Sequence, residues 1–246
     1  MTGARLGRAV AAELVKLRSL PAFAATVLGT VLFGAAIAAA YAAMPREGDL
    51  AGVPGSLGDV VALAIPYAQL GMIVLGILPV GHETGARVLR TSFAAVPVRG
   101  FVVAGKTVAV SAAAAVTSLL AVAVSAGIAA LVGGDAIHTH LDGEGLRKLA
   151  GAALALVLVA LLAHALALLL SGIVPSLTAA LVLLVLLPPL LAGLGETARW
   201  LPDRAAAALY SDGAAVPDPL TGFLVAAGWI GLIGVLGALR FSRSES

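Results

Sequence analysis

Residues 146–170 read LRKLAGAALALVLVALLAHALALLL, and this stretch decides what kind of protein the chain can be. After Arg147 and Lys148 no charged side chain follows as far as Leu170, and His164 is the one ionisable residue in that run. A helix needs about 20 consecutive apolar residues to cross roughly 30 Å of hydrocarbon. Because lipid offers no hydrogen bonds, such a segment must satisfy its backbone groups internally. We therefore predict a transmembrane α-helix here.

Five further segments have the same character: 21–43, 58–80, 101–132, 175–194 and 220–239. The 246 residues are 61% hydrophobic and 11% charged, with a mean hydropathy of +1.07, whereas soluble domains carry about 25% charged residues. The alternating pattern of a membrane β-barrel is absent. The expected fold class is an all-α membrane protein with six transmembrane helices, and 1–246 forms a single transmembrane domain.

Basic residues divide unevenly between the two sides that six alternating spans create. Ten of the 15 lie on the side that holds both termini and the 81–100 connection, and the other five lie on the opposite side. Connections rich in Lys and Arg stay in the cytosol. We therefore expect cytosolic termini and a multi-pass protein of the cell (plasma) membrane. The composition is rich in Ala, Leu and Val, and Arg greatly outnumbers Lys, which is typical of a GC-rich bacterial genome.

The first of two amphipathic segments on this side precedes the first span, at 4–18. Leu6, Val10, Leu14 and Leu17 repeat with helical spacing, and Arg5, Arg8 and Lys16 lie to the other side. This pattern favours a helix in the membrane interface, with its basic residues near anionic lipid. Ser19 is predicted to cap the helix that follows, and Pro21 to begin it.

The second amphipathic segment is the connection between the second and third spans, at 83–96. Val88, Leu89, Phe93 and Val96 share one arc of a helical wheel, and Arg87 and Arg90 lie on the opposite arc. Glu83 and Arg87 can pair at i, i+4, and Pro97 ends the helix. An apolar face presented at the membrane surface suits either lipid or a partner protein.

The long connection at 195–220 is expected outside the cell. Pro188 and Pro189 should break the fifth helix just before it. Trp200 and Tyr210 suit the membrane interface, and we expect one or two short helices dipping toward the membrane.

One motif invites a nucleotide-binding interpretation. Residues 100–107, GFVVAGKT, satisfy the phosphate-loop pattern G-x-x-x-x-G-K-[ST]. That loop works only between a strand and a helix, where its backbone N–H groups cradle phosphate. Here an apolar span follows at once, so we interpret the match as coincidental and expect Lys106 to snorkel from the inner end of the third span.

The other reactive residues match no catalytic or metal-binding pattern. The chain has no cysteine, and the sequence after His82 and Glu83 lacks the second histidine of a zinc motif. His138 and His140 lie near acidic residues in an outer connection, and solvated histidines are the simpler interpretation. We therefore expect no catalytic site, no bound metal, no cofactor and no nucleic-acid partner.

Polar residues inside the spans are the remaining candidates. His164 lies in the fourth span, and Tyr67 and Gln69 lie in the second. An ionisable residue within a membrane is a functional candidate by default, but polar side chains also join helices by hydrogen bonds. These three residues are candidates either for a substrate path or for helix packing.

Three features together resemble the permease subunit of ABC-2-type ATP-binding-cassette exporters. They are Glu13-x-x-Lys16-Leu17-Arg18-Ser19 before the first span, the stretch from Glu83 to Gly100 followed by Lys106, and the six-span plan with a long connection before the last span. The resemblance implies a half-transporter that pairs with a second copy of itself or a related permease, and with separate cytosolic ATPase subunits.

In such a permease the 83–96 segment is a coupling helix seated on the ATPase, carried by Glu83, Arg87, Val88, Leu89, Arg90 and Phe93. The 4–18 helix, with Glu13, Lys16 and Arg18, is the interfacial helix, and Glu13 or Lys16 could pair with the coupling region. The substrate would be amphipathic: a drug, an antibiotic, a peptide or a lipid-like compound. The alternatives are a secondary transporter or another polytopic membrane protein. The scarcity of carboxylates in the spans argues against ion coupling.

Overall fold

The computed structural model describes residues 2–44, 55–85, 99–134, 137, 142–213 and 216–243, and the regular elements assigned there are helices. They are α1 (Thr2–Ser19), α2 (Pro21–Ala42), α3 (Leu57–Gly85), α5 (Arg99–Gly133), α6 (Gly143–Leu170), α7 (Ile173–Leu181), η2 (Val182–Leu186), α8 (Leu187–Leu190), η3 (Ala192–Trp200), α9 (Pro202–Ala207) and α10 (Pro219–Arg243). Six helical stretches are long and apolar enough to span a membrane, as predicted.

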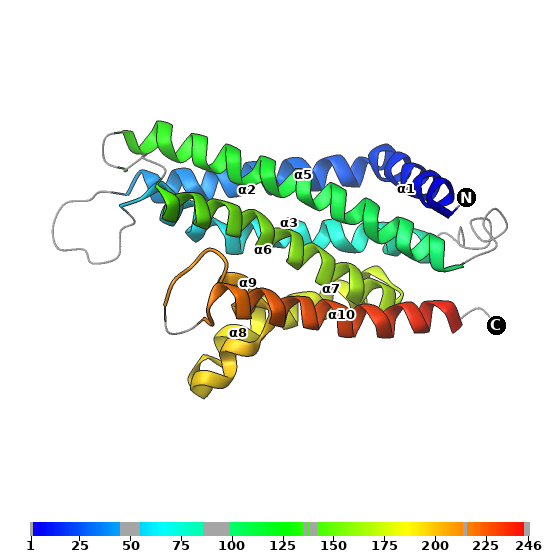
Figure 1. The fold of residues 1–246 in the computed structure, drawn as a ribbon. Helices are drawn as coiled ribbons and strands as arrows, with labels where there is room; N and C mark the ends of the chain where they lie inside the picture. The colour runs from blue at the N-terminus through cyan, green and yellow to red at the C-terminus, as the bar shows by residue number, and fades with distance from the viewer. Residues whose placement is uncertain are drawn as a thin grey trace.

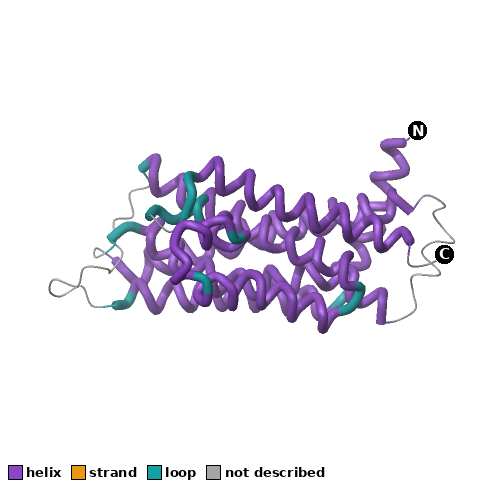
Figure 2. The backbone as a smooth tube through the Cα atoms, turned by 90° about the horizontal axis from the view of Figure 1, so that it is seen from below, coloured by secondary structure: helices purple, strands orange, loops and turns teal. Residues whose placement is uncertain are grey.

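The long helices run side by side along one axis, and both termini lie at the same end of the bundle (Figures 1 and 2). The interior is formed by α6 and α3, whose most apolar windows are 72% and 61% buried, against 22% for α2 and α10. Exposed leucine and valine side chains cover the outer helices. In a membrane these surfaces meet lipid rather than water, so their exposure has no energetic penalty.

The break between α1 and α2 is a single residue, Leu20. Its extended backbone separates the helices, and Pro21 occupies the first position of α2, where its missing N–H has no partner to lose. Ser19 was predicted to cap α2, and this was wrong. Its hydroxyl donates to the Lys16 carbonyl, 2.8 Å away, and so closes the last turn of α1.

The fifth span is irregular because two prolines follow each other near its end. Pro188 and Pro189 cannot donate to the carbonyls one turn earlier, and the helix widens to a π-turn at η2 just before them. The span ends at Leu190, close to the predicted break. From there η3 extends away from the bundle (Figure 1).

The connection between the fifth and sixth spans then returns to the bundle as α9. Ala205, Ala206, Leu209 and Tyr210 belong to the main hydrophobic core. Two glycines permit this close packing: a Cβ on Gly151 of α6 would collide with the Leu209 carbonyl, and one on Gly222 of α10 with the Ala205 carbonyl. Short helices were predicted here, but Tyr210 was predicted at the interface and is instead buried in the core.

Candidate functional site

The end of the bundle that holds the termini contains a buried ion pair. Lys106 Nζ of α5 lies 2.8 Å from Glu13 Oε2 of α1, and Lys16 Nζ lies 2.9 Å from Glu13 Oε1. The Lys106 side chain is 1% exposed and also donates to the Pro79 carbonyl of α3 at 3.2 Å. The prediction that Lys106 snorkels to the surface was therefore wrong. Its ammonium group instead joins three helices.

Local packing explains how Glu13 reaches this position. α1 lies on α5, with Ala9 against Gly105, where an added Cβ would be 3.0 Å from the Ala9 Cβ. One helical turn further along are Glu13 and then Leu17, both buried. The face of α1 predicted from Val10, Leu14 and Leu17 is therefore close to the observed one. The sequence pattern missed that Glu13, a charged residue, shares it.

Electrostatics keep this carboxylate ionised. Burial alone would raise the pKa of the Glu13 carboxyl, but the ammonium groups of Lys106 and Lys16 outweigh burial and hold the pKa below its usual value. A buried charge is tolerated only with a hydrogen-bonded partner of opposite charge. The position of α1 is thus fixed by a charge pair as well as by apolar contacts.

His164 of α6 lies beside this ion pair and contacts both α3 and α5. Its Nδ1 is 3.2 Å from the Gly76 carbonyl of α3, and its Nε2 is 3.3 Å from the hydroxyl of Thr107, the neighbour of Lys106. Because a carbonyl can only accept, Nδ1 is the donor to Gly76. The Thr107 hydroxyl has a single proton, which can go either to Nε2 or to the Val103 carbonyl, 3.0 Å away. Gly76 is required for this approach, since a Cβ there would collide with the Ala160 carbonyl.

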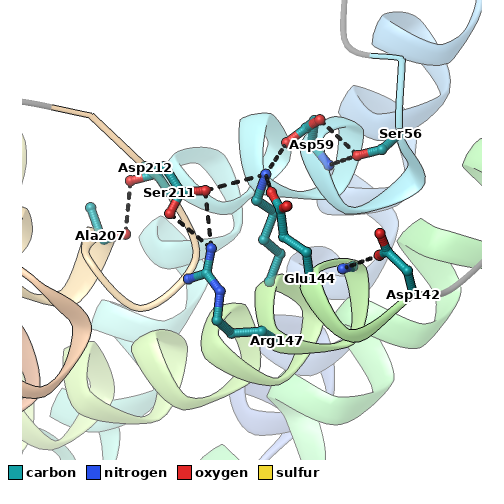
Figure 3. Close-up of polar contacts among 10 residues, drawn as sticks. Ser56, Asp59, Asp142, Glu144, Arg147, Ala207, Ser211 and Asp212 are labelled. Atoms are coloured by element: carbon teal, nitrogen blue, oxygen red, sulfur yellow. Dashed lines mark hydrogen bonds and ion pairs between the residues drawn. The ribbon is translucent and has the colours of Figure 1, made fainter.

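A second polar cluster closes the opposite end of the bundle (Figure 3). Lys148 Nζ lies 2.7 Å from Asp59, 2.7 Å from Glu144 and 3.3 Å from Asp212. Arg147 also binds Asp212, at 2.8 Å. The carboxylates are about half exposed, so the energetic contribution of each pair is modest. Together they fasten the start of α3, the start of α6 and the segment after α9. The sequence pattern gave no reason to join these residues, and the cluster was not predicted.

The candidate path residues lie in different surroundings. Tyr67 is 39% exposed and meets Phe33 edge-on, with 6.2 Å between ring centroids. It lines an open groove of about 320 Å³ between α2 and α3. Gln69 is 6% exposed, and its side chain acts to lower the pKa of Asp203 of α9. With His164 held against Gly76, the three side chains each contact a different neighbour.

The remaining predicted site residues are placed only in part. Glu13, Lys16 and the exposed Arg18 lie on α1. Glu83 lies in the last turn of α3, and its side chain is outside the described set. Arg87, Val88, Leu89, Arg90 and Phe93 fall outside the described residues, so their role stays a prediction.

The phosphate-loop match forms no loop. Residues 100–107 lie within the first turns of α5, so they form a regular helix and not the loop that cradles phosphate between a strand and a helix. Within the described residues, no group of three or more His, Cys, Asp and Glu side chains could hold a metal ion. No protein-family model matches the chain, and no curated protein matches it. The chain is a polytopic membrane protein by its six apolar helices.

Proposed function

We propose that this chain is the permease subunit of an ATP-driven exporter of the ABC-2 type, in the cell membrane. The observation that carries the proposal is the buried Glu13–Lys106 pair. It fastens α1 to the bundle at the end where α3 leads into the segment 86–98 and α5 leads out of it. In the resemblance, this segment is the coupling helix that contacts the ATPase.

ATP-driven transport requires that force pass from the ATPase subunit to the transmembrane helices. A cytosolic ATPase can move transmembrane helices only through an element that does not slip against them. Lys106 Nζ binds α1 through Glu13 and α3 through the Pro79 carbonyl, so α1, α3 and α5 move together at this end. In this proposal, binding of the ATPase to 83–96 displaces all three helices, and the bundle opens toward the other side.

The partners follow from the same proposal. Two ATPase subunits bind from the cytosol, a second permease completes the translocation path, and the apolar outer helices face lipid. The substrate is an amphipathic compound, because the residues along the spans are apolar and small.

The rival function is a secondary transporter, and one observation favours it. The sequence suggested that carboxylates are scarce in the spans, yet Asp203 of α9 interacts with Gln69, a buried residue of α3. An ion-coupled transporter would use such a group. The two functions differ in whether an ATPase subunit is required.

The test is to purify the full chain from its native membranes and assay for a bound ATPase. Phe93→Ala and Arg90→Glu should remove ATPase binding and substrate-stimulated hydrolysis, because truncating a buried anchor typically costs about 2 kcal/mol or more, some thirtyfold in affinity. Leu131→Ala, a residue 80% exposed at the far end of α5, and Arg46→Glu in the opposite connection are the matched controls.

Two results would exclude the proposal. One is transport by the reconstituted chain alone under an ion gradient without ATP. The other is ATPase binding in which Phe93→Ala and Arg90→Glu behave as their controls do.

A further inference from the structure

The N-terminal helix α1 lies beside the bundle at the level where the spans begin. Its Ala9 lies against Gly105 of α5, and its Glu13 binds Lys106, whereas the apolar span of α5 begins at Val103. Figure 2 shows this helix turned across the direction of the long helices. α1 therefore runs along the boundary of the membrane, and the side that faces away from α5 meets the layer of lipid headgroups.

The apolar face of α1 is occupied by protein and not by lipid. Glu13 and Leu17 are buried, and Val10 and Leu14 are partly buried, so this face holds α1 to the bundle. The sequence predicted a helix that enters the interface through these apolar side chains, which would leave them in contact with lipid. Because the structure uses that face for packing, α1 meets the membrane through its other face.

The outer face of α1 carries two arginines with an apolar residue between them. Helical spacing places Arg8, Val15 and Arg18 on the side opposite Glu13, and all three are exposed, Val15 to 69%. The two arginines lie about 15 Å apart along the helix axis, at 1.5 Å per residue. We call Arg8, Val15 and Arg18 the outer face of α1.

The charges of α1 leave this outer face positive. The helix carries one acidic residue, Glu13, and four basic residues, Arg5, Arg8, Lys16 and Arg18. Both oxygens of the Glu13 carboxylate are bound by lysines, Oε2 by Lys106 and Oε1 by Lys16. The carboxylate is therefore directed toward the bundle and does not neutralise the arginines of the outer face. A surface of this kind attracts anionic groups.

The position of the outer face favours lipid over an acidic protein as the source of those groups. Leu20 alone separates α1 from α2, whose Pro21 begins the first span, so Arg18 lies within about one helical turn of the membrane boundary. A guanidinium group at that level can bind phosphate oxygens, and Val15 can reach the start of the acyl chains. An exposed valine between two cations has no such apolar neighbour in water.

We propose that the outer face of α1 is a binding surface for anionic phospholipids at this end of the bundle. Arg8 and Arg18 bind the headgroups, and Val15 contacts the acyl chains beneath them. Lys106 joins α1 to α3 and α5, so the bound lipids are fixed against the bundle and not against a detached helix. This surface depends neither on the identity of the transported compound nor on an ATPase subunit.

The experiment measures which lipid lies against α1 in the full chain. The chain has no cysteine, so Ala12→Cys, exposed on α1, carries a single fluorophore that brominated acyl chains quench. The protein is reconstituted in vesicles of phosphatidylcholine and phosphatidylglycerol, with one or the other lipid brominated. We expect stronger quenching by phosphatidylglycerol. Because one arginine near an anionic surface is worth about fivefold in binding, Arg8→Gln or Arg18→Gln should lower this preference up to about fivefold, and the double variant should abolish it.

Three comparisons show whether the preference comes from the charge of this face. Arg8→Lys with Arg18→Lys should retain it, because both charges remain. Arg240→Gln, an exposed arginine of α10 at the same end, should leave it unchanged. The preference should also weaken between 0.1 M and 1 M salt, because the Debye length falls from about 10 Å to about 3 Å.

Two results would overturn the proposal. One is equal quenching by the two lipids in the protein with both arginines, which is the result expected if the outer face binds an acidic protein instead. The other is a preference for phosphatidylglycerol that persists in the double Arg8→Gln, Arg18→Gln variant. A fluorophore at Leu131→Cys, 80% exposed at the far end of α5, serves as the reference position, where the same two substitutions should change nothing.

Discussion

The buried Glu13–Lys106 pair predicts an unequal response to removal of its two partners. Glu13→Gln leaves the ammonium group of Lys106, 1% exposed, without its carboxylate partner, because the Gln amide oxygen and the Pro79 carbonyl are neutral acceptors. Leaving such a charge without its partner costs about 3–5 kcal/mol of stability. Lys106→Met leaves the Glu13 carboxylate, which still binds Lys16 at 2.9 Å. The loss is then one charge-assisted hydrogen bond, about 1.5–3 kcal/mol.

Combining the two changes should restore most of the stability, because a buried ion pair replaced by uncharged side chains is close to neutral. The expected double mutant lies within about 1 kcal/mol of the natural protein, and the coupling energy from the cycle is about 3 kcal/mol or more. Lys16→Met is the control: its side chain is 45% exposed, so its loss should cost less than about 1 kcal/mol.

The assay is reversible denaturation of the chain in mixed micelles, followed by circular dichroism, for the three single variants and the double variant. A double mutant whose loss equals the sum of the two single losses would refute the buried pair. A cost for Lys106→Met that exceeds that of Glu13→Gln would refute the argument that Lys16 shares the carboxylate.

Four further predictions rest on separate contacts. Gly76→Ala should lower the melting temperature, because its Cβ would collide with the Ala160 carbonyl; Gly127→Ala, with nothing within 4 Å, is the comparison that should leave it unchanged. The pKa of Asp203 is raised from 3.8 to about 6, so the folded protein binds more protons than the unfolded chain between these values. Stability should therefore fall by at most about 3 kcal/mol as pH rises through about 6, and Asp203→Asn should remove this dependence. Acid should act in the opposite direction through Glu13, whose pKa is lowered in the folded protein. The stability that its carboxylate contributes above the usual pKa of a glutamate should be lost as pH falls through this lowered pKa. Glu13→Gln should not show this loss in acid. Finally, cytosolic termini predict that Ser244→Cys is protected from an impermeant reagent in intact cells while Asp142→Cys is labelled, and the reverse pattern would invert the orientation.

The two pH effects also distinguish the two ends of the bundle. Glu13 is held charged by two lysines, whereas Asp203 has an amide and apolar neighbours. Their contributions to stability therefore change in opposite directions on acidification, and each is removed by its own isosteric variant. Stability measured as a function of pH, for the natural protein and for Glu13→Gln and Asp203→Asn, separates the two contributions.

Much of the candidate site could be noticed in the sequence but not assembled from it. Glu13, Lys16, Gln69 and His164 were each singled out as charged or polar residues in or beside a span. Helical spacing gave no reason to join Glu13 to Lys106, 93 residues away, or Gln69 to Asp203. Pairing between residues so far apart along the chain depends on how two helices cross in space. Helical periodicity in the sequence does not predict that crossing.

The sequence by itself determined the fold class and the number of spans. Lipid cannot hydrogen-bond a peptide group, so a run of about 20 apolar residues has no other folded form than a helix. The breaks were also local: Pro21 begins one helix and Pro188 with Pro189 ends another. Each of these conclusions needs only residues that are neighbours along the chain.

The tertiary structure alone decided which polar groups are buried. Lys106 was expected in water and Tyr210 at the interface, yet both lie inside the bundle. The reason is close approach at particular glycines: Gly105 admits α1, and Gly151 with Gly222 admits the segment around α9. Where two backbones can touch, the side chains beside them lose water and must find partners across the contact. That outcome depends on the three-dimensional meeting of segments, which apolar periodicity does not specify.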